Sequence, residues 1–241
     1  MALKDFSFDA DIGECIGVVG RNGAGKTTLF KLLSDIQLPE EGSIFFNGVN
    51  ITNNYSKDLK RQFGVCLDGE FLIEDFNAYE YLEFISKLYA LKDISKNIFD
   101  LINYFFDNLD GLTKPIKTYS YGMRQKILLI SSIIHRPLVL ILDEPFNGLD
   151  VFSSNKLLNL LKRILPHSII FIASHNLNYI NQIATSIVLL EEGETLFKGT
   201  IDVFLSRGKG EISESLYEFV KPDFDKVDDL DWIKKYPNNN V

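Results

Sequence analysis

The stretch GRNGAGKTT, Gly20–Thr28, decides the fold, because it matches the pattern GxxxxGK[ST] of a phosphate-binding loop. The short apolar run before it, ECIGVVG, contains β-branched residues and predicts a buried strand. The residues after it, TTLFKLLSDI, place apolar side chains at helical spacing. A strand, a glycine-rich turn and a helix start are the context that this motif requires, so we predict a nucleotide site here.

The residue types of this loop suit the binding of phosphate. Its glycines let the backbone curl and approach a ligand, and the curled N–H groups and the helix N-terminus attract anions. The Lys26 ammonium can reach the β- and γ-phosphates, and the Thr27 hydroxyl can ligate Mg²⁺. A glycine turn that binds nothing is the alternative, and the flanking segments disfavour it. The candidate nucleotide-binding residues are Gly20, Arg21, Asn22, Gly23, Ala24, Gly25, Lys26, Thr27 and Thr28.

Composition narrows the class of protein. The chain has 241 residues, of which 46% are hydrophobic, and this is enough for one sizeable core with a subdomain. Its net charge of −8 disfavours a nucleic-acid surface as the main partner. Cys15 and Cys66 lie in apolar, strand-like runs, which favours core packing in a reducing compartment over a metal site or a disulfide. There is no signal peptide, and no apolar run approaches the about 18 residues of a membrane span, so any pore would belong to another chain.

Apolar patterning predicts a mixed order of strands and helices. Alternation of Phe6, Phe8 and Ala10 with polar residues predicts an edge strand that runs to Gly13. Further strands are expected at residues 43–46, 61–67, 138–142 and 168–174, with a final hairpin over 186–197 that turns at Glu192 and Gly193.

Helical periodicity appears between two of these strands. Apolar and aromatic residues recur every three or four positions over residues 76–91 and again over 94–109, and a third apolar helix is expected over 123–135. These segments predict a helical insertion at about residues 68–136. The end of the chain from Arg207 is polar and acidic, and a loose helix and a frayed tail are the two interpretations.

Asp143 and Glu144 directly follow the apolar run LVLIL. Such a run is typical of a parallel strand covered on both faces, and ligands bind at the carboxyl ends of such strands. Beside a phosphate loop, Asp143 can hold Mg²⁺ or its water, and Glu144 can take a proton from an attacking water. A solvated acidic turn is the alternative, and the full stretch LVLILDEPFNGLD makes it far less favoured.

Five motifs together resemble those of the ATP-binding-cassette (ABC) ATPase domain, and the resemblance covers about residues 3–200. They correspond to Walker A, the signature, Walker B, the D-loop and the switch histidine, and they stand in the family's order at Gly20–Thr28, Tyr119–Met123 (YSYGM), Leu138–Glu144, Gly148–Asp150 and His175. The resemblance implies an α/β fold with a P-loop NTPase (RecA-like) core, N-terminal antiparallel β strands and an inserted α-helical subdomain. We expect the ABC domain to span residues 1–206 and a short acidic tail to span 207–241.

The resemblance also implies a second anion site. Ser120 suits the N-cap of the helix that follows, and Gly122 leaves the backbone of its first turn exposed. In the family, this site grips the γ-phosphate of ATP on the facing subunit, so that a head-to-tail dimer sandwiches two ATP molecules. Glu144 would be the general base, and His175 would orient the γ-phosphate and the attacking water. Asp68 and Asp150 complete the expected catalytic set, and Thr27, Asp143 and Asp68 are the expected Mg²⁺ ligands.

Three departures from the family pattern stand out. Tyr121 and Met123 replace Gly and Gln of the common signature LSGGQ, and this S-x-G-M form resembles export-type cassettes. Asp68 stands where the family usually has Gln, and its side chain is shorter and charged but can still contact Mg²⁺ through water. The aromatic residue that stacks on adenine belongs to a strand that would precede Met1, so Phe6 and Phe8 are expected in the core.

The expected function is that of an ATP-hydrolysing subunit of an ABC exporter. It would lie in the cytoplasm, on the inner face of the membrane, and work with an integral-membrane permease on a separate chain. With ATP bound it would form a homodimer or a heterodimer, and no nucleic acid is expected. The alternatives are a soluble ABC-type ATPase that acts on ribosomes or DNA, and a regulatory nucleotide-binding module that does not turn over ATP.

Overall fold

The structure is a computed structural model that describes residues 3–52, 56–67, 72–92 and 94–220. The chain separates into two compact units, Met1–Ile201 and Asp202–Val241. In the described ranges, no helix combines the length and the apolar character that a membrane span requires.

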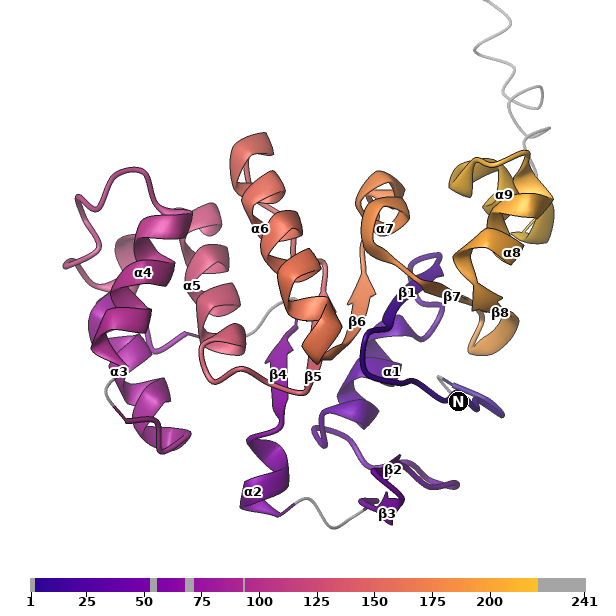
Figure 1. Cartoon of the computed structure of the whole chain (residues 1–241), viewed down its shortest axis with the longest axis horizontal. Helices are drawn as coiled ribbons and strands as arrows, with labels where there is room; N and C mark the ends of the chain where they lie inside the picture. The colour runs from indigo at the N-terminus through magenta and orange to yellow at the C-terminus, as the bar shows by residue number, and fades with distance from the viewer. Residues whose placement is uncertain (1–2, 53–55, 68–71, 93, 221–241) are drawn as a thin grey trace, which may run out of the picture. The chain divides into compact units, whose positions relative to one another are not determined.

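A six-stranded sheet forms the centre of the first unit. Its order is β4-β5-β6-β1-β7-β8, and every neighbouring pair is parallel except the last, β7 and β8. Figure 1 shows β4, β5, β6 and β1 side by side. The strands are β1 (Cys15–Gly20), β4 (Phe63–Cys66), β5 (Val139–Asp143), β6 (Ile169–Ala173), β7 (Ser186–Glu191) and β8 (Glu194–Thr200).

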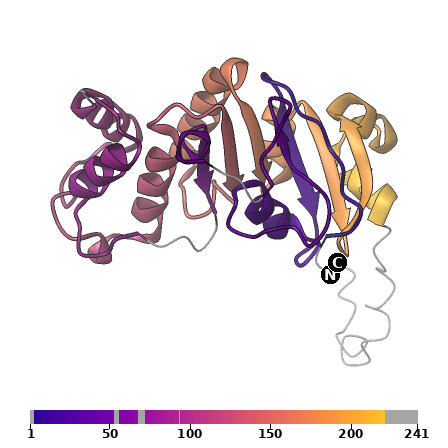
Figure 2. The same cartoon turned by 90° about the horizontal axis from the view of Figure 1, so that it is seen from below.

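Helices cover both faces of this sheet, which explains why its central strands are continuous apolar runs. All five residues of β5 are buried, as are the first five of β1. The helix α1 (Lys26–Leu33) lies on one face, and α6 (Val151–Ile164) and α7 (Leu177–Ile183) lie on the other (Figure 2). Cys15 and Cys66 are both buried, which confirms their predicted place in the core.

The predicted helical insertion is formed by α3 (Ala78–Leu88), α4 (Ser95–Phe105) and α5 (Tyr121–Ile133). The first two are slightly shorter than their apolar patterns, and α5 begins and ends two residues earlier than predicted. A capping box starts α3, since the side chains of Asn77 and Glu80 satisfy backbone N–H groups reciprocally. The helix α5 packs directly on β4. The contact is so close that a Cβ at Gly64 would collide with the carbonyl oxygen of Ser132. This contact fixes the signature helix against the sheet.

The predicted edge strand up to Gly13 does not form, although its alternation is real. Phe6, Phe8 and Ala10 are half-buried against the core while the residues between them are exposed. Residues 4–12 carry no strand ladder, and Lys4 N instead donates to Gly193 O at 2.7 Å. Burial of every second side chain requires only an extended chain that lies on an apolar surface. The alternation was therefore not sufficient to predict a hydrogen-bonded strand.

Short elements complete the first unit. The expected strand near residues 43–46 is β2 (Phe45–Phe46), and it pairs with β3 (Val49–Asn50) across a turn in which Asn47 and Gly48 both have positive φ. The predicted turn between β7 and β8 has the same form, with positive φ at Glu192 and Gly193. A four-residue helix, α2 (Lys57–Lys60), and 3₁₀ turns at Ile116–Thr118 and Leu165–His167 connect the larger elements.

The second unit contains the rest of α8 (Ile201–Leu205), a 3₁₀ turn at Ser206–Gly208 and α9 (Ile212–Val220). The Phe204 ring is fully buried, and its centroid lies 5.6 Å from that of Phe219. The Arg207 guanidinium carbon lies 4.8 Å from the Phe219 centroid. Of the two interpretations for this end, the described part is a packed helix, and the aspartates of the expected tail lie outside the described residues.

Candidate functional site

The phosphate-loop motif lies between the end of β1 and the start of α1. Gly25 caps α1 with a φ of 109° and no side-chain hydrogen bond, so no side chain of the cap occupies the first-turn N–H groups. A Cβ at Gly20 would collide with the carbonyl oxygen of Leu190 in β7, which explains why glycine is required there. The turn after β7 supports the loop as well, because Gly193 N donates to Ala24 O at 3.0 Å.

Lys26 folds back over this loop. Its Nζ donates to Gly20 O at 2.8 Å and to Arg21 O at 3.0 Å. Burial lowers the pKa of the Lys26 ammonium, while the nearby carboxylates of Glu144 and Asp143 act in the opposite direction. Lys26 is thus a partly desolvated cation at the mouth of a loop whose backbone N–H groups favour anions.

Thr27 and Asp143 bring two oxygen atoms together. The Thr27 hydroxyl donates to Asp143 Oδ2 at 2.8 Å, across the contact between the first turn of α1 and the end of β5. The side chain of Asp143 is only 3% exposed. Oxygen ligands of this kind suit Mg²⁺, which usually takes one or two protein ligands and completes its shell with water and phosphate. The third expected ligand, Asp68, lies outside the described residues.

Glu144 is held in a strained backbone conformation beside the end of β6. Its φ is 51°, in the left-handed region, and its N–H donates to Ala173 O at 2.9 Å. The carboxylate receives the backbone N–H of His175 at 3.0 Å on Oε2, while His175 Nε2 lies 3.4 Å from Oε1. Burial raises the pKa of Glu144, and the hydrogen bond from the His175 backbone opposes this rise. A carboxyl that takes up a proton readily in this place suits a general base.

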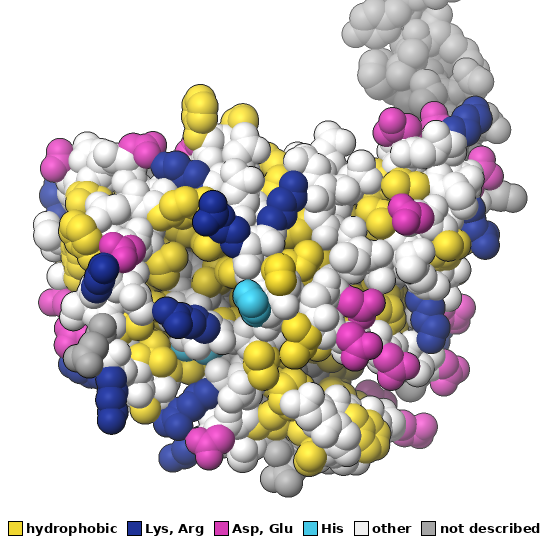
Figure 3. Space-filling model, in the orientation of Figure 1, with side chains coloured by type: hydrophobic (Ala, Val, Ile, Leu, Met, Phe, Trp, Pro, Cys, Tyr) yellow, Lys and Arg dark blue, Asp and Glu magenta, His cyan; other side chains and the backbone are white. Residues whose placement is uncertain are grey.

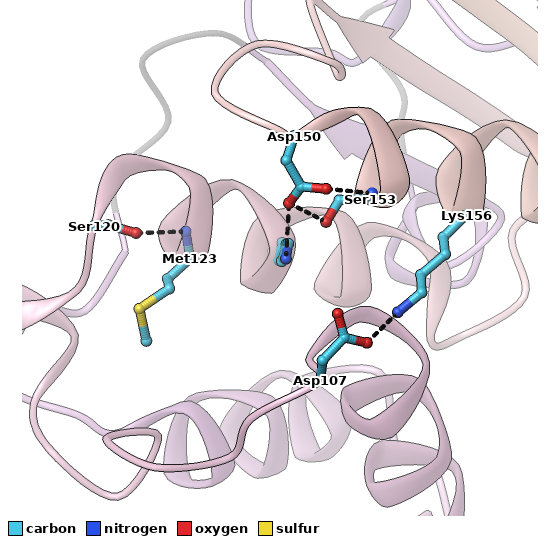
Figure 4. Close-up of polar contacts among 7 residues, drawn as sticks. Asp107, Ser120, Met123, Asp150, Ser153 and Lys156 are labelled. Atoms are coloured by element: carbon cyan, nitrogen blue, oxygen red, sulfur yellow. Dashed lines mark hydrogen bonds and ion pairs between the residues drawn. The ribbon is translucent and has the colours of Figure 1, made fainter.

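A second group of predicted residues lies where α5 and α6 begin. Ser120 caps α5, and its Oγ accepts the N–H of Met123 at 3.3 Å (Figure 4). The backbone at Gly122 touches the D-loop, because a Cβ there would lie 2.5 Å from Gly148 O. Gly148 has a φ of 72°, and a Cβ on it would collide with the Tyr121 ring.

Asp150 caps α6, the helix that follows the D-loop. Its Oδ1 accepts the N–H of Ser153 at 2.8 Å, and its Oδ2 accepts the hydroxyl of Ser153 at 2.7 Å (Figure 4). These hydrogen bonds lower the pKa of the Asp150 carboxyl, the backbone bond from Ser153 most of all. The structure therefore gives Asp150 a capping role at this helix start, and its place in the catalytic set stays a prediction.

The predicted residues thus fall into two groups on different elements. The first, on β1, α1, β5 and the end of β6, contains Lys26, Thr27, Asp143, Glu144 and His175. The second, at the starts of α5 and α6, contains Ser120, Gly122 and Asp150. Gln125, a buried amide that contacts the backbone next to Glu144, is a further residue that none of the sequence motifs indicates. A glutamine among the apolar residues of this helix was the available signal.

Comparison with known proteins identifies this arrangement. The family model "ABC transporter" matches residues 3–147. The chain belongs to the ABC transporter family. The ABC transporter ATP-binding protein NatA of Bacillus subtilis is 31% identical over 238 residues, covering 96% of this chain and 88% of NatA. The methionine import ATP-binding protein MetN 4 of Oceanobacillus iheyensis is 30% identical, covering 95% of this chain and 69% of its own.

Solved structures agree with the ABC fold. An ATP-binding subunit of an ABC transporter, 27% identical, superimposes with a TM-score of 0.83 over 90% of this chain and 92% of the other. An ATP-binding cassette solved as a dimer after hydrolysis, bound to ADP and Pi, gives a TM-score of 0.75 at 21% identity, which supports the fold alone. The predicted family, the P-loop NTPase fold and the assignment as an ABC ATPase are confirmed.

Proposed function

We propose that this ABC ATPase is the ATP-hydrolysing subunit of a transporter, and that ATP binding closes a head-to-tail dimer which hydrolysis reopens. Transport would pass through a separate membrane subunit. The single observation that carries the proposal is the pair of buried carboxylates at the end of β5, Asp143 and Glu144. Asp143 binds the Thr27 hydroxyl of the phosphate loop, and Glu144 binds His175, so a phosphate site and a proton acceptor adjoin.

ATP binding follows from the loop. The N–H groups of the loop and of the first turn of α1 would receive the phosphates, and Lys26 would exchange its two backbone carbonyl partners for phosphate oxygens. The oxygen atoms of Thr27 and Asp143 fit Mg²⁺, with Asp68 as a further proposed ligand. When bound, Mg²⁺ would neutralise charge on the β- and γ-phosphates.

Hydrolysis follows from the residues after β5. Glu144 would accept a proton from the water that attacks the γ-phosphate in line, and His175 would orient this water and the γ-phosphate. The ring of His175 is well placed for both, since its Nε2 lies near Glu144 while 60% of its side chain is exposed. Lys26 and Ser120 of a second copy would stabilise the charge that develops in the transition state.

The second copy is proposed because the two groups of predicted residues lie on different elements. The starts of α5 and α6 present exposed apolar side chains, with Tyr121 54%, Val151 68% and Phe152 78% exposed. Apolar surface of this kind beside a helix N-terminus suits a protein partner that brings bound phosphate with it. Two solved ATP-binding cassettes that share this fold form dimers, and we propose the same assembly here.

The remaining partners also belong to the proposal. We propose a permease on another chain, a cytoplasmic place on the inner membrane face, a homodimer or heterodimer, and a cassette over residues 1–206 with a tail over 207–241. Basic and acidic side chains are interspersed on the face in Figure 3. The export direction rests on the S-x-G-M signature, and a relative named for methionine import is 30% identical, so transport measurements must decide it.

A turnover assay tests the proposed function. Phosphate release from Mg²⁺-ATP by the purified chain should fall about 10²–10⁴-fold in Glu144→Gln, because this variant keeps the shape of the side chain but cannot act as the base. The variant should still bind ATP. Wild-type turnover in Glu144→Gln would place the base elsewhere, and a wild-type chain that binds ATP without turnover would favour the regulatory module.

A further inference from the structure

Gln125 is a buried polar residue for which the mechanism above has no use. Its side chain is 7% exposed on α5, where the neighbouring Ile127 and Leu129 are fully buried. The amide Nε2 donates to Pro145 O at 3.4 Å and to Cys66 Sγ at 3.9 Å. Burial of an amide is costly unless it is hydrogen-bonded, and here the partners come from two other elements. Gln125 therefore connects three segments of the first unit.

These three segments meet at the catalytic end of the sheet. Cys66 ends β4, Pro145 directly follows Glu144, and α5 is the helix that begins after Ser120. Glu144 has left-handed backbone geometry, which is strained and persists only where neighbours enforce it. On one side, β6 enforces it through the bond from Glu144 N to Ala173 O. On the other side, Pro145, the residue after Glu144, accepts the Gln125 amide with its own carbonyl oxygen.

We propose that Gln125 is a positioning residue for hydrolysis, whose amide ties the signature helix to the backbone next to Glu144. The position of α5, set by what binds at Ser120, would then determine how the Glu144 carboxylate is aimed. This inference rests on the proposed function, because it assigns Gln125 an effect on the general base. It goes beyond that function because it names the connection between the signature and the general base. This connection consists of the first five residues of α5 and the hydrogen bond from the Gln125 amide to Pro145 O.

The chemistry of the side chain makes the inference testable. Methionine fills a similar volume without an N–H donor, so Gln125→Met removes the bond to Pro145 O with little loss of packing. Gln182 on α7 is a matched control, because its exposed amide donates to Asn178 O at 3.2 Å within its own helix. Replacing Gln182 by Met removes one amide donor without touching the catalytic end.

The experiment is a double-mutant cycle on the full chain with Mg²⁺-ATP. Gln125→Met should lower kcat about 5- to 100-fold, since a buried carbonyl loses its donor, and leave KM within about twofold. In the Glu144→Gln background, the same substitution should leave the residual turnover unchanged, because the residue acts through Glu144. Gln182→Met should leave kcat unchanged in both backgrounds.

Each other result has a defined meaning. Unchanged kcat in Gln125→Met, or an equal loss in the Glu144→Gln background, would overturn the proposal. Gln125→Leu serves as a second variant if Gln125→Met is not folded, with the same expectations, and failure of both to fold would show that Gln125 serves the fold instead. Failure of the proposed function would give a different result. The wild-type chain would then show no turnover, or Glu144→Gln alone would show wild-type turnover.

Discussion

The helices α1 and α5 both begin where an anion is proposed to bind, but their first turns are completed differently. Gly25 caps α1 without any side-chain hydrogen bond. Ser120 caps α5 with its own hydroxyl, which accepts the N–H of Met123 at 3.3 Å. N–H groups at a helix start attract phosphate, so α1 offers a site for a ligand, whereas at α5 the Ser120 hydroxyl already accepts one of these N–H groups.

This difference suggests how the two sites divide the work. The start of α1 contains Lys26 and lies beside Asp143 and Glu144, so the proposed nucleotide site and the proposed base lie within one chain. The start of α5 instead packs on Gly148 of the D-loop and exposes Tyr121. Its anion would have to arrive with a second chain, which is why the proposed site is completed in trans.

Lys26→Ala should have the largest effect on the α1 side. Removal of the charged partner of a buried phosphate costs about 2–5 kcal/mol, so ATP affinity should fall about 30- to 4,000-fold. Isothermal titration calorimetry measures this loss, and Lys31→Ala, in the last turn of α1, is the control that should leave affinity unchanged. Equal ATP affinity in Lys26→Ala and the wild type would remove the basis of the phosphate-loop assignment.

Gly148→Ala tests the packing of the α5 start on the D-loop. Left-handed geometry costs alanine about 1–2 kcal/mol of folding free energy, and overlap with the Tyr121 ring should add to this loss. Gly111→Ala is the matched control, because Gly111 has a φ of 90° but open space around its Cβ position. Urea unfolding should show a larger loss for Gly148→Ala, and equal losses would mean that the ring contact contributes nothing.

Ser120→Ala should have the smallest effect on stability. Loss of a serine cap costs about 1 kcal/mol, and ATP affinity of the isolated chain should not change, because Ser120 would contact only the nucleotide of a second copy. Ser56 is a matched control, since its hydroxyl also caps a helix, α2, by accepting Leu59 N at 3.2 Å. Turnover should fall in Ser120→Ala but not in Ser56→Ala, and a parallel fall in both would reduce Ser120 to an ordinary cap.

Much of this arrangement could be predicted from the sequence. Local patterns were sufficient to predict three features. Glycine spacing predicted the phosphate loop, continuous apolar runs predicted the parallel strands, and helical periodicity predicted the insertion. The Ser120 cap could be predicted for the same reason, since a cap is a hydrogen bond between residues close in sequence. The contact between Thr27 and Asp143 joins residues far apart in the chain, and it followed from the rule that ligands gather at the carboxyl ends of strands.

The features that could not be predicted depend on tertiary contacts. Phe6 and Phe8 alternate like a strand, but whether such a segment joins a ladder depends on a partner that the pattern does not specify. Gln125 gave no spacing signal, because its meaning arises only when α5 places it against Pro145. The close approach of the Tyr121 ring to Gly148 likewise appears only once the start of α5 is packed on the D-loop.

The association state of Glu144→Gln tests the central claim most directly. Sedimentation velocity should show a monomer without nucleotide and a dimer with Mg²⁺-ATP, because the variant binds ATP but hydrolyses it very slowly. Adding Ser120→Glu should abolish the dimer while ATP remains bound, since its carboxylate repels the phosphate brought by the second chain, whereas Ser56→Glu should not. A Glu144→Gln chain that stays monomeric with ATP bound, or a dimer indifferent to Ser120→Glu, would contradict a site completed in trans.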